Sequence, residues 1–96
     1  MQTSTAVNSD LQITVTARLF ALYREAAGED RLQVAVPTAT TVRELWQHLV
    51  AVAPQLQRTS KMIASTAYAV NGDWATGDQT LQDGDEVAFL PPVSGG

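Results

Sequence analysis

The sequence contains no cysteine, and this absence excludes several kinds of chemistry at once. Without thiols there is no disulfide framework, no cysteine-ligated zinc or iron–sulfur site, and no thiol nucleophile. Redox chemistry by the protein's own side chains is therefore not expected. A chain of 96 residues without such crosslinks must be stabilised by the packing of one modest core.

Basic residues and long apolar runs are also scarce. Six Lys and Arg stand against ten Asp and Glu, which leaves a formal net charge of −4 and no broad basic stripe for a phosphate backbone. No apolar run approaches the roughly 20 residues that span a bilayer, and residues 1–10 lack the features of a secretory signal. We expect a cytoplasmic protein that binds neither nucleic acid nor membrane, with residues 1–10 as a flexible leader.

Alternating apolar and polar residues predict two strands in the first part of the chain. The first covers 11–19, and the second covers 30–36 and ends at Pro37, which has no N–H to donate to a sheet. Between them, residues 21–27 are rich in helix formers and stop at Gly28, a residue suited to the left-handed conformation that ends helices. This pattern predicts a strand, a short helix and a second strand antiparallel to the first.

The clearest helix of the sequence follows. Thr41 and Glu44 have the spacing of a capping box, and Pro54 bounds the helix at its other end. Apolar residues recur on one helical face: Val42, Leu45, Trp46, Leu49, Val50 and Ala53. His48 lies on the opposite face without partner residues, so we interpret it as solvated. Residues 55–66 carry no readable pattern beyond an isolated apolar pair at 62–63.

The last third of the chain reads as short strands joined by tight turns. Residues 67–70 lead into Asn71 and Gly72, a pair typical of a type I′ hairpin turn, and a short strand follows near Trp74. Residues 81–85 form another turn. The final strand has two faces, with Val87 and Phe89 on one and Glu86, Ala88 and Leu90 on the other.

No side-chain active site is visible in the sequence. There is no phosphate loop, no nucleophile elbow and no plausible Ser/His/Asp group. Several carboxylates suggest a metal site, but their spacing does not match a calcium loop, and turn chemistry explains them: Asp73, Asp78, Asp83, Asp85 and Glu86. We expect no metal site and no enzymatic activity of the protein by itself.

The order of the predicted elements indicates an α+β fold of the β-grasp type, in which a mixed sheet wraps around one main helix. We expect the domain to cover residues 11–90. A flexible tail of residues 91–96 follows and ends in two glycines, so the reactive group of the protein is predicted to be its terminal carboxylate.

Three motifs resemble those of a known family. Residues 83–96, Asp-Gly-Asp-Glu-Val-Ala-Phe-Leu-Pro-Pro-Val-Ser-Gly-Gly, resemble its closing signature almost residue by residue, and residues 20–25 and 69–71 resemble two weaker signatures. The family is the small, sulfur-carrying subunit of molybdopterin synthase, in the ubiquitin-like β-grasp superfamily. The sequence departs from it in the polar leader and at Leu90, where an aromatic residue is often found.

The resemblance implies a specific role for the tail. An ATP-using, ubiquitin-activating-type adenylyltransferase would adenylate the carboxylate of Gly96, and a sulfur-donating enzyme would convert it to a thiocarboxylate. The large synthase subunit, the partner in a heterotetramer that this resemblance implies, would use the sulfur on a cyclic pyranopterin precursor. No cofactor is expected on the chain itself. Gly95 would leave clearance for attack at the carboxyl carbon, since it has no side chain.

The resemblance also predicts a surface for partners. The first and last strands of a β-grasp sheet run parallel and side by side, so Phe20 and Leu90 should lie together where the tail departs. Pro91 and Pro92 would hold that exit extended, and Val93 would enter the partner with the tail. From the residues alone, Phe20 has two interpretations: either a loop folds over it or a partner contacts it.

The sequence leaves other functions open. A sulfur carrier for thiamine or for transfer-RNA thiolation would share the tail chemistry and differ in its partner. A ubiquitin-like protein modifier would use the same activated carboxyl without sulfur. A plain β-grasp interaction domain would require the terminal glycines to be irrelevant.

Overall fold

The computed structural model describes residues 11–92, from Leu11 to Pro92. The predicted leader, residues 1–10, lies outside the described residues, and so do Val93, Gly95 and Gly96 of the predicted tail.

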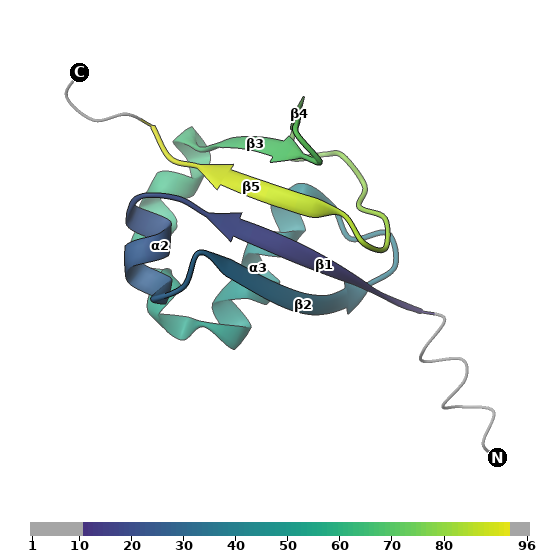
Figure 1. The fold of residues 1–96 in the computed structure, drawn as a ribbon, viewed down its shortest axis with the longest axis horizontal. Helices are drawn as coiled ribbons and strands as arrows, with labels where there is room; N and C mark the ends of the chain where they lie inside the picture. The colour runs from purple at the N-terminus through teal and green to yellow at the C-terminus, as the bar shows by residue number, and fades with distance from the viewer. Residues whose placement is uncertain (1–10, 93–96) are drawn as a thin grey trace, which may run out of the picture.

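Five strands form one mixed sheet in the order β2-β1-β5-β3-β4. The central strands β1 and β5 are parallel, and the other neighbouring pairs are antiparallel (Figure 1). The strand bounds are Gln12–Leu19 for β1, Arg31–Pro37 for β2, Ala67–Val70 for β3, Asp73–Ala75 for β4 and Glu86–Leu90 for β5. Because β1 and β5 are parallel, the start of β1 and the end of β5 lie at opposite ends of the sheet (Figure 1).

The helical segments lie against one face of this sheet and at one end of it (Figure 1). They are α2 (Leu22–Ala27), α3 (Val42–Val52) and η1 (Pro54–Ser65), the last made of successive 3₁₀ turns. The sheet wrapped around α3 is the ubiquitin-like β-grasp arrangement that the sequence predicted. We call the face of the sheet turned away from α3 the outer face.

An aromatic cluster forms the middle of the core. Tyr23 of α2, Trp46 of α3 and Phe89 of β5 have ring centroids 5.3 to 6.4 Å apart, and Tyr68 of β3 packs edge-on against Phe89 at 5.6 Å. Phe89 and Tyr23 are completely buried. Tilted and edge-on pairs of this kind add to the stabilisation from burial alone. The cluster ties both helices to the last strand, and therefore to the start of the tail.

The capping box, the hairpin turn and the helix-ending glycine that the sequence predicts are all present in the structure. The Thr41 hydroxyl accepts the Glu44 backbone N–H while the Glu44 carboxylate accepts the Thr41 N–H, which is the complete capping box. Asn71 and Gly72 both have positive φ, 52° and 87°, as a type I′ turn requires. Gly28, at φ 82°, ends α2 in the left-handed conformation.

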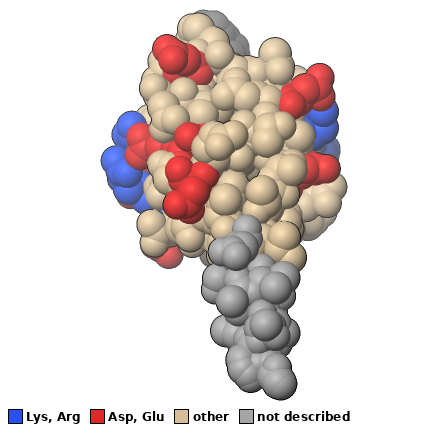
Figure 2. Space-filling model, turned by 90° about the vertical axis from the view of Figure 1, so that its right-hand side faces the viewer, with Lys and Arg blue, Asp and Glu red and all other residues tan. Residues whose placement is uncertain are grey.

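Two of the turn carboxylates accept backbone amides, Asp85 within its own turn, as turn chemistry predicts, and Asp83 from strand β1. Asp83 accepts the Thr14 N–H at 2.8 Å, and Asp85 accepts the Gln82 N–H at 2.7 Å. Two others form ion pairs instead: Asp78 with Arg43 and Glu86 with Arg31, each at 2.6 Å. Figure 2 shows acidic side chains on this end of the molecule, opposite the exit of the tail.

The segment without a readable sequence pattern is η1. It is anchored by Leu56, which is fully buried, and by an indole hydrogen bond from Trp46 Nε1 to Ser60 Oγ at 3.3 Å. Its far end returns to α2, because the Tyr23 hydroxyl is 2.5 Å from the hydroxyl of Thr66, the residue after η1. This segment thus forms one wall at the end of the sheet where β5 finishes.

Candidate functional site

An apolar groove lies where the chain leaves the sheet. It has a volume of about 480 Å³. Its lining comes from the end of β1, the start of α2, η1 and the end of β5: Phe20, Ala21, Leu22, Met62, Leu90, Pro91 and Pro92. We call it the tail-exit groove. Four residues predicted to bind partners, namely Phe20, Leu90, Pro91 and Pro92, are therefore brought together in one place.

Sheet register places Phe20 next to Leu90. Leu19 is the partner of Phe89 in the parallel β1–β5 ladder, and both of these side chains point into the core. Because side chains alternate along a strand, the following residues, Phe20 and Leu90, are directed away from the core. Their neighbourhood was predicted from the fold, and the register confirms it. Their contact with a partner stays a prediction.

Phe20 is half-buried rather than covered. The guanidinium of Arg18 lies 5.1 Å from the centroid of its ring, within the range of a cation–π contact. Arg18 and Phe20 are two residues apart, so they share one side of the strand. The ring therefore lies next to a guanidinium and also lines the apolar groove.

The backbone at the groove is strained. Ala21 has φ 50° and ψ −122°, a conformation that residues other than glycine rarely adopt. It makes the turn between β1 and α2, after which Tyr23 N–H bonds to the Phe20 carbonyl at 3.1 Å. Such outliers persist only where surrounding packing enforces them. The turn places Phe20 and Leu22 on the same groove.

Sequence reasoning missed the far wall of the groove. Met62 of η1 and Leu22 of α2 line it, and both are partly buried against the core. The isolated apolar pair at 62–63 was the available signal, but no periodicity connected it to the tail. A flexible methionine suits a groove that must adapt to different side chains.

Trp74 is another residue that sequence reasoning did not assign to the site. Its side chain is 76% exposed on the edge strand β4. Register places it opposite Ala69, which lies opposite Ala88, so all three share the outer face. The two alanine side chains are too small to cover the Trp74 side chain. This row of apolar residues runs across the sheet next to Leu90.

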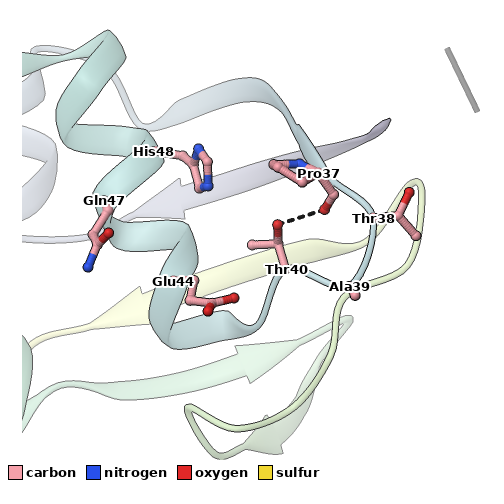
Figure 3. A pocket seen from close by; sticks show the side chains of 7 residues that line it. All are labelled: Pro37, Thr38, Ala39, Thr40, Glu44, Gln47 and His48. Carbon is pink, nitrogen blue, oxygen red and sulfur yellow. Dashed lines mark hydrogen bonds between the residues drawn. The ribbon is translucent and has the colours of Figure 1, made fainter. Parts of the chain in front are cut away.

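A smaller hollow of about 280 Å³ lies at the opposite end of the molecule (Figure 3). Glu44 and His48 of α3 face the loop after β2 there, and His48 is half-buried rather than fully solvated as predicted. Two of its polar side chains are engaged within the chain: Thr40 donates to the Pro37 carbonyl at 2.6 Å, and Glu44 belongs to the capping box. The hollow shares no lining residue with the tail-exit groove.

Within residues 11–92, no group of three or more His, Cys, Asp and Glu side chains is arranged to hold a metal ion. Over the same residues, no helix is long and apolar enough to cross a membrane. The candidate site that the described residues offer is the tail-exit groove.

Comparison with known proteins identifies the family. The ThiS family profile matches residues 17–96, most of the chain and all of the tail. The chain belongs to the ThiS family. It is 41% identical to the molybdopterin synthase sulfur carrier subunit of Escherichia coli over 80 residues, which cover 80% of this chain and 93% of that one.

Solved structures support the same family. SAMP1 from Haloferax volcanii, a small archaeal modifier protein, matches with a TM-score of 0.75 and 31% identity, covering 86% of this chain and 99% of that one. The complex of subunits 1 and 2 of the molybdopterin-converting factor from Helicobacter pylori matches with a TM-score of 0.57 and 25% identity, over 88% of this chain and all of that one. A chain with this fold can thus act as one subunit of a larger assembly.

Proposed function

We propose that this ThiS-family protein is the sulfur carrier of molybdopterin biosynthesis. The observation that carries the proposal is the similarity to molybdopterin synthase sulfur carrier subunits, together with a family match that extends through the terminal glycines. The chain is then a substrate and subunit of other enzymes and performs no catalysis by itself. Its reactive group is the carboxylate of Gly96.

The chemistry of a terminal carboxylate requires partners. Its ordinary pKa of roughly 3.3–3.7 makes it an anion at neutral pH and a poor electrophile. An ATP-using adenylyltransferase of the ubiquitin-activating type forms the acyl adenylate on Gly96 and releases pyrophosphate. Sulfur from a donor enzyme then displaces AMP and leaves a thiocarboxylate, which gives its sulfur to a cyclic pyranopterin precursor in the large subunit.

The tail has the reach that such transfers need. Six residues, 91–96, extend about 20 Å when fully stretched, enough to enter a partner's site while the domain stays outside. Pro91 and Pro92 have fixed φ angles, which reduces the number of directions in which the tail can leave. Gly95 and Gly96 have no side chains to block a narrow channel, and Val93 is the one aliphatic side chain that enters with them.

The docking surface in this proposal is the tail-exit groove with the outer face beside it. Phe20 and Leu90 stand at the base of the tail, and Trp74 extends the apolar surface across the sheet. Contiguous exposed apolar surface of this kind marks protein interfaces. The large subunit would cover it when the tail enters, in a complex of two subunits like that of the Helicobacter pylori molybdopterin-converting factor.

Intact mass spectrometry tests the proposal. The protein is incubated with ATP, an adenylyltransferase of this type and a sulfur donor, and we expect one oxygen to be exchanged for sulfur at Gly96. A chain lacking Gly96 is the matched control and should keep its mass. Addition of the large subunit and precursor should then yield molybdopterin. An unchanged mass in the presence of active enzymes would refute the carrier function.

Protein modification is the second candidate, because SAMP1, a small archaeal modifier protein, resembles this chain closely in structure. The same activated Gly96 would then be joined to lysines of other proteins. Adducts on other proteins without sulfur exchange would favour this function. Carriers for thiamine or for transfer-RNA thiolation would exchange the oxygen but fail to support molybdopterin synthesis.

A further inference from the structure

Strong nucleophiles are almost absent from this chain. It has no cysteine, and of its six basic residues five are arginines, which leaves Lys61 as the single lysine. A guanidinium stays protonated under any condition that proteins tolerate, so arginines do not attack acyl groups. An activated C-terminus therefore meets one amine side chain in its own sequence, that of Lys61.

Lys61 lies beside the exit of the tail. It is exposed on η1, and the next residue, Met62, lines the tail-exit groove together with Pro91 and Pro92. Figure 1 shows the end of η1 and the end of β5 at the same end of the molecule. His48, by contrast, lies in the hollow at the opposite end. Lys61 is thus the single lysine of the sequence, and its neighbour in the chain lines the groove from which the tail departs.

Chain length permits the two groups to meet. Four residues, 93–96, can span about 13 Å beyond Pro92, which itself lines the same groove as the neighbour of Lys61. Tethering an electrophile and a nucleophile on one chain replaces a bimolecular encounter with an intramolecular one, which greatly raises their effective concentration. The flexible side chain of a lysine adds further reach.

We propose that Lys61 is the acceptor of the chain's own activated C-terminus. The uncharged ε-amine attacks the acyl carbon of Gly96, an amide C–N bond forms, the C–O bond to AMP breaks, and AMP and the amine's proton leave. The product is an isopeptide loop with no free carboxylate, which removes that molecule from sulfur transfer. The inference rests on the proposed activation of Gly96 and names a side reaction of the same intermediate.

A thioester probe tests the step without any activating enzyme. The full chain is prepared with a thioester at Gly96 by intein cleavage with a small thiol, and is then held in mildly alkaline dilute buffer. We expect a monomer that has lost one water relative to the free acid, at a rate independent of protein concentration. Peptide mapping should locate the new amide between Gly96 and Lys61.

Two variants make the test specific. Lys61→Arg keeps the charge at an exposed position and should cyclise at least about tenfold more slowly, since the nearby amine is gone. The double variant with Lys61→Arg and Arg43→Lys again has one lysine, now at the start of α3, and should not regain cyclisation. Circular dichroism checks that both variants are folded.

The outcomes separate this inference from the carrier function. Hydrolysis alone, closure at Met1, or a dimer joined through Lys61 would each overturn the intramolecular acceptor. A protein that fails to cyclise but exchanges oxygen for sulfur with the enzymes overturns the Lys61 inference and leaves the carrier function standing. A protein that cyclises but never accepts sulfur overturns the carrier function and leaves the Lys61 inference standing.

Discussion

Leu19 lies opposite Phe89 in the parallel pairing of β1 with β5, and both side chains are almost completely buried. This pairing decides where the next residue of each strand goes. Phe20 and Leu90 leave the core together at the same end of the sheet, and the tail begins directly after one of them. The register of the core thus brings these two side chains together where the chain leaves the sheet.

Charge introduced on this surface should weaken binding to the large subunit. We expect Phe20→Asp combined with Leu90→Asp to raise the Kd at least about 30-fold, which corresponds to roughly 2 kcal/mol for losing central apolar contacts. Calorimetry or surface plasmon resonance measures this. Leu11→Asp is the control, because Leu11 is 56% exposed at the opposite end of β1. An unchanged Kd in the double variant would show that partners dock elsewhere.

Removal of the two tryptophan side chains should affect the free energy of unfolding very differently. Trp46 is 7% exposed and donates to Ser60, whereas Trp74 is 76% exposed. We expect Trp46→Ala to lower the free energy of unfolding by about 3–5 kcal/mol and Trp74→Ala to change it by no more than about 0.5 kcal/mol. Urea unfolding followed by circular dichroism tests both.

Trp74→Ala should nevertheless weaken binding to the large subunit if the outer face belongs to the docking surface. An exposed aromatic residue with no stabilising role is a typical interface anchor. A variant with normal stability and normal affinity would remove Trp74 from the proposed surface while leaving Phe20 and Leu90 in it.

Elements with a local cause were predictable from the sequence. The capping box of Thr41 and Glu44 and the hairpin turn at Asn71 and Gly72 depend on residues a few positions apart, and each formed as expected. The β-grasp topology followed from the order of such elements and from the resemblance of the tail. The family resemblance also brought Phe20 and Leu90 together before their register was known.

The rest of the site depends on contacts between distant segments. Met62 reaches the groove because η1 packs against α2, and Trp74 joins the outer face because two hairpin registers align it with Ala88. Neither segment has a periodic pattern that would specify its partner. The strain at Ala21 is likewise invisible in the sequence, since alanine has no preference for a positive φ.

Relief of that strain should stabilise the protein. Ala21 has φ 50°, which costs roughly 1–3 kcal/mol in a non-glycine residue, while glycine gives back about 0.5–1 kcal/mol in entropy. We therefore expect Ala21→Gly to raise the free energy of unfolding by about 1 kcal/mol. Ala51→Gly, at an exposed position of α3, should lower it by about 1 kcal/mol. Denaturant midpoints with equal m-values test the pair, and destabilisation by Ala21→Gly would contradict the strain.

Stability should fall in alkali because one phenol, that of Tyr23, is buried and the other, that of Tyr68, is partly buried. Burial raises the pKa of Tyr23 above its ordinary value of 10.0, against the opposing hydrogen bond from Thr66, and burial also raises the pKa of Tyr68. Well below pH 10 both phenols are neutral in the folded and unfolded chains, so their contribution is complete. Above it the unfolded chain loses these protons first, and unfolding becomes easier until the folded phenols also ionise.

Replacement of the phenols tests this pH dependence. Tyr23→Phe loses the contact with Thr66, so it should lower the free energy of unfolding at neutral pH by about 1 kcal/mol. Its alkaline loss should be smaller than that of the parent protein, and the variant with Tyr68→Phe as well should lose least. These are the only tyrosines of the sequence, so phenolate absorbance reports their titration directly. Each shifted phenol contributes at most about 1.4 kcal/mol per pH unit to the decline. An equally steep alkaline decline in the double variant, which has neither phenol, would assign the effect to other groups.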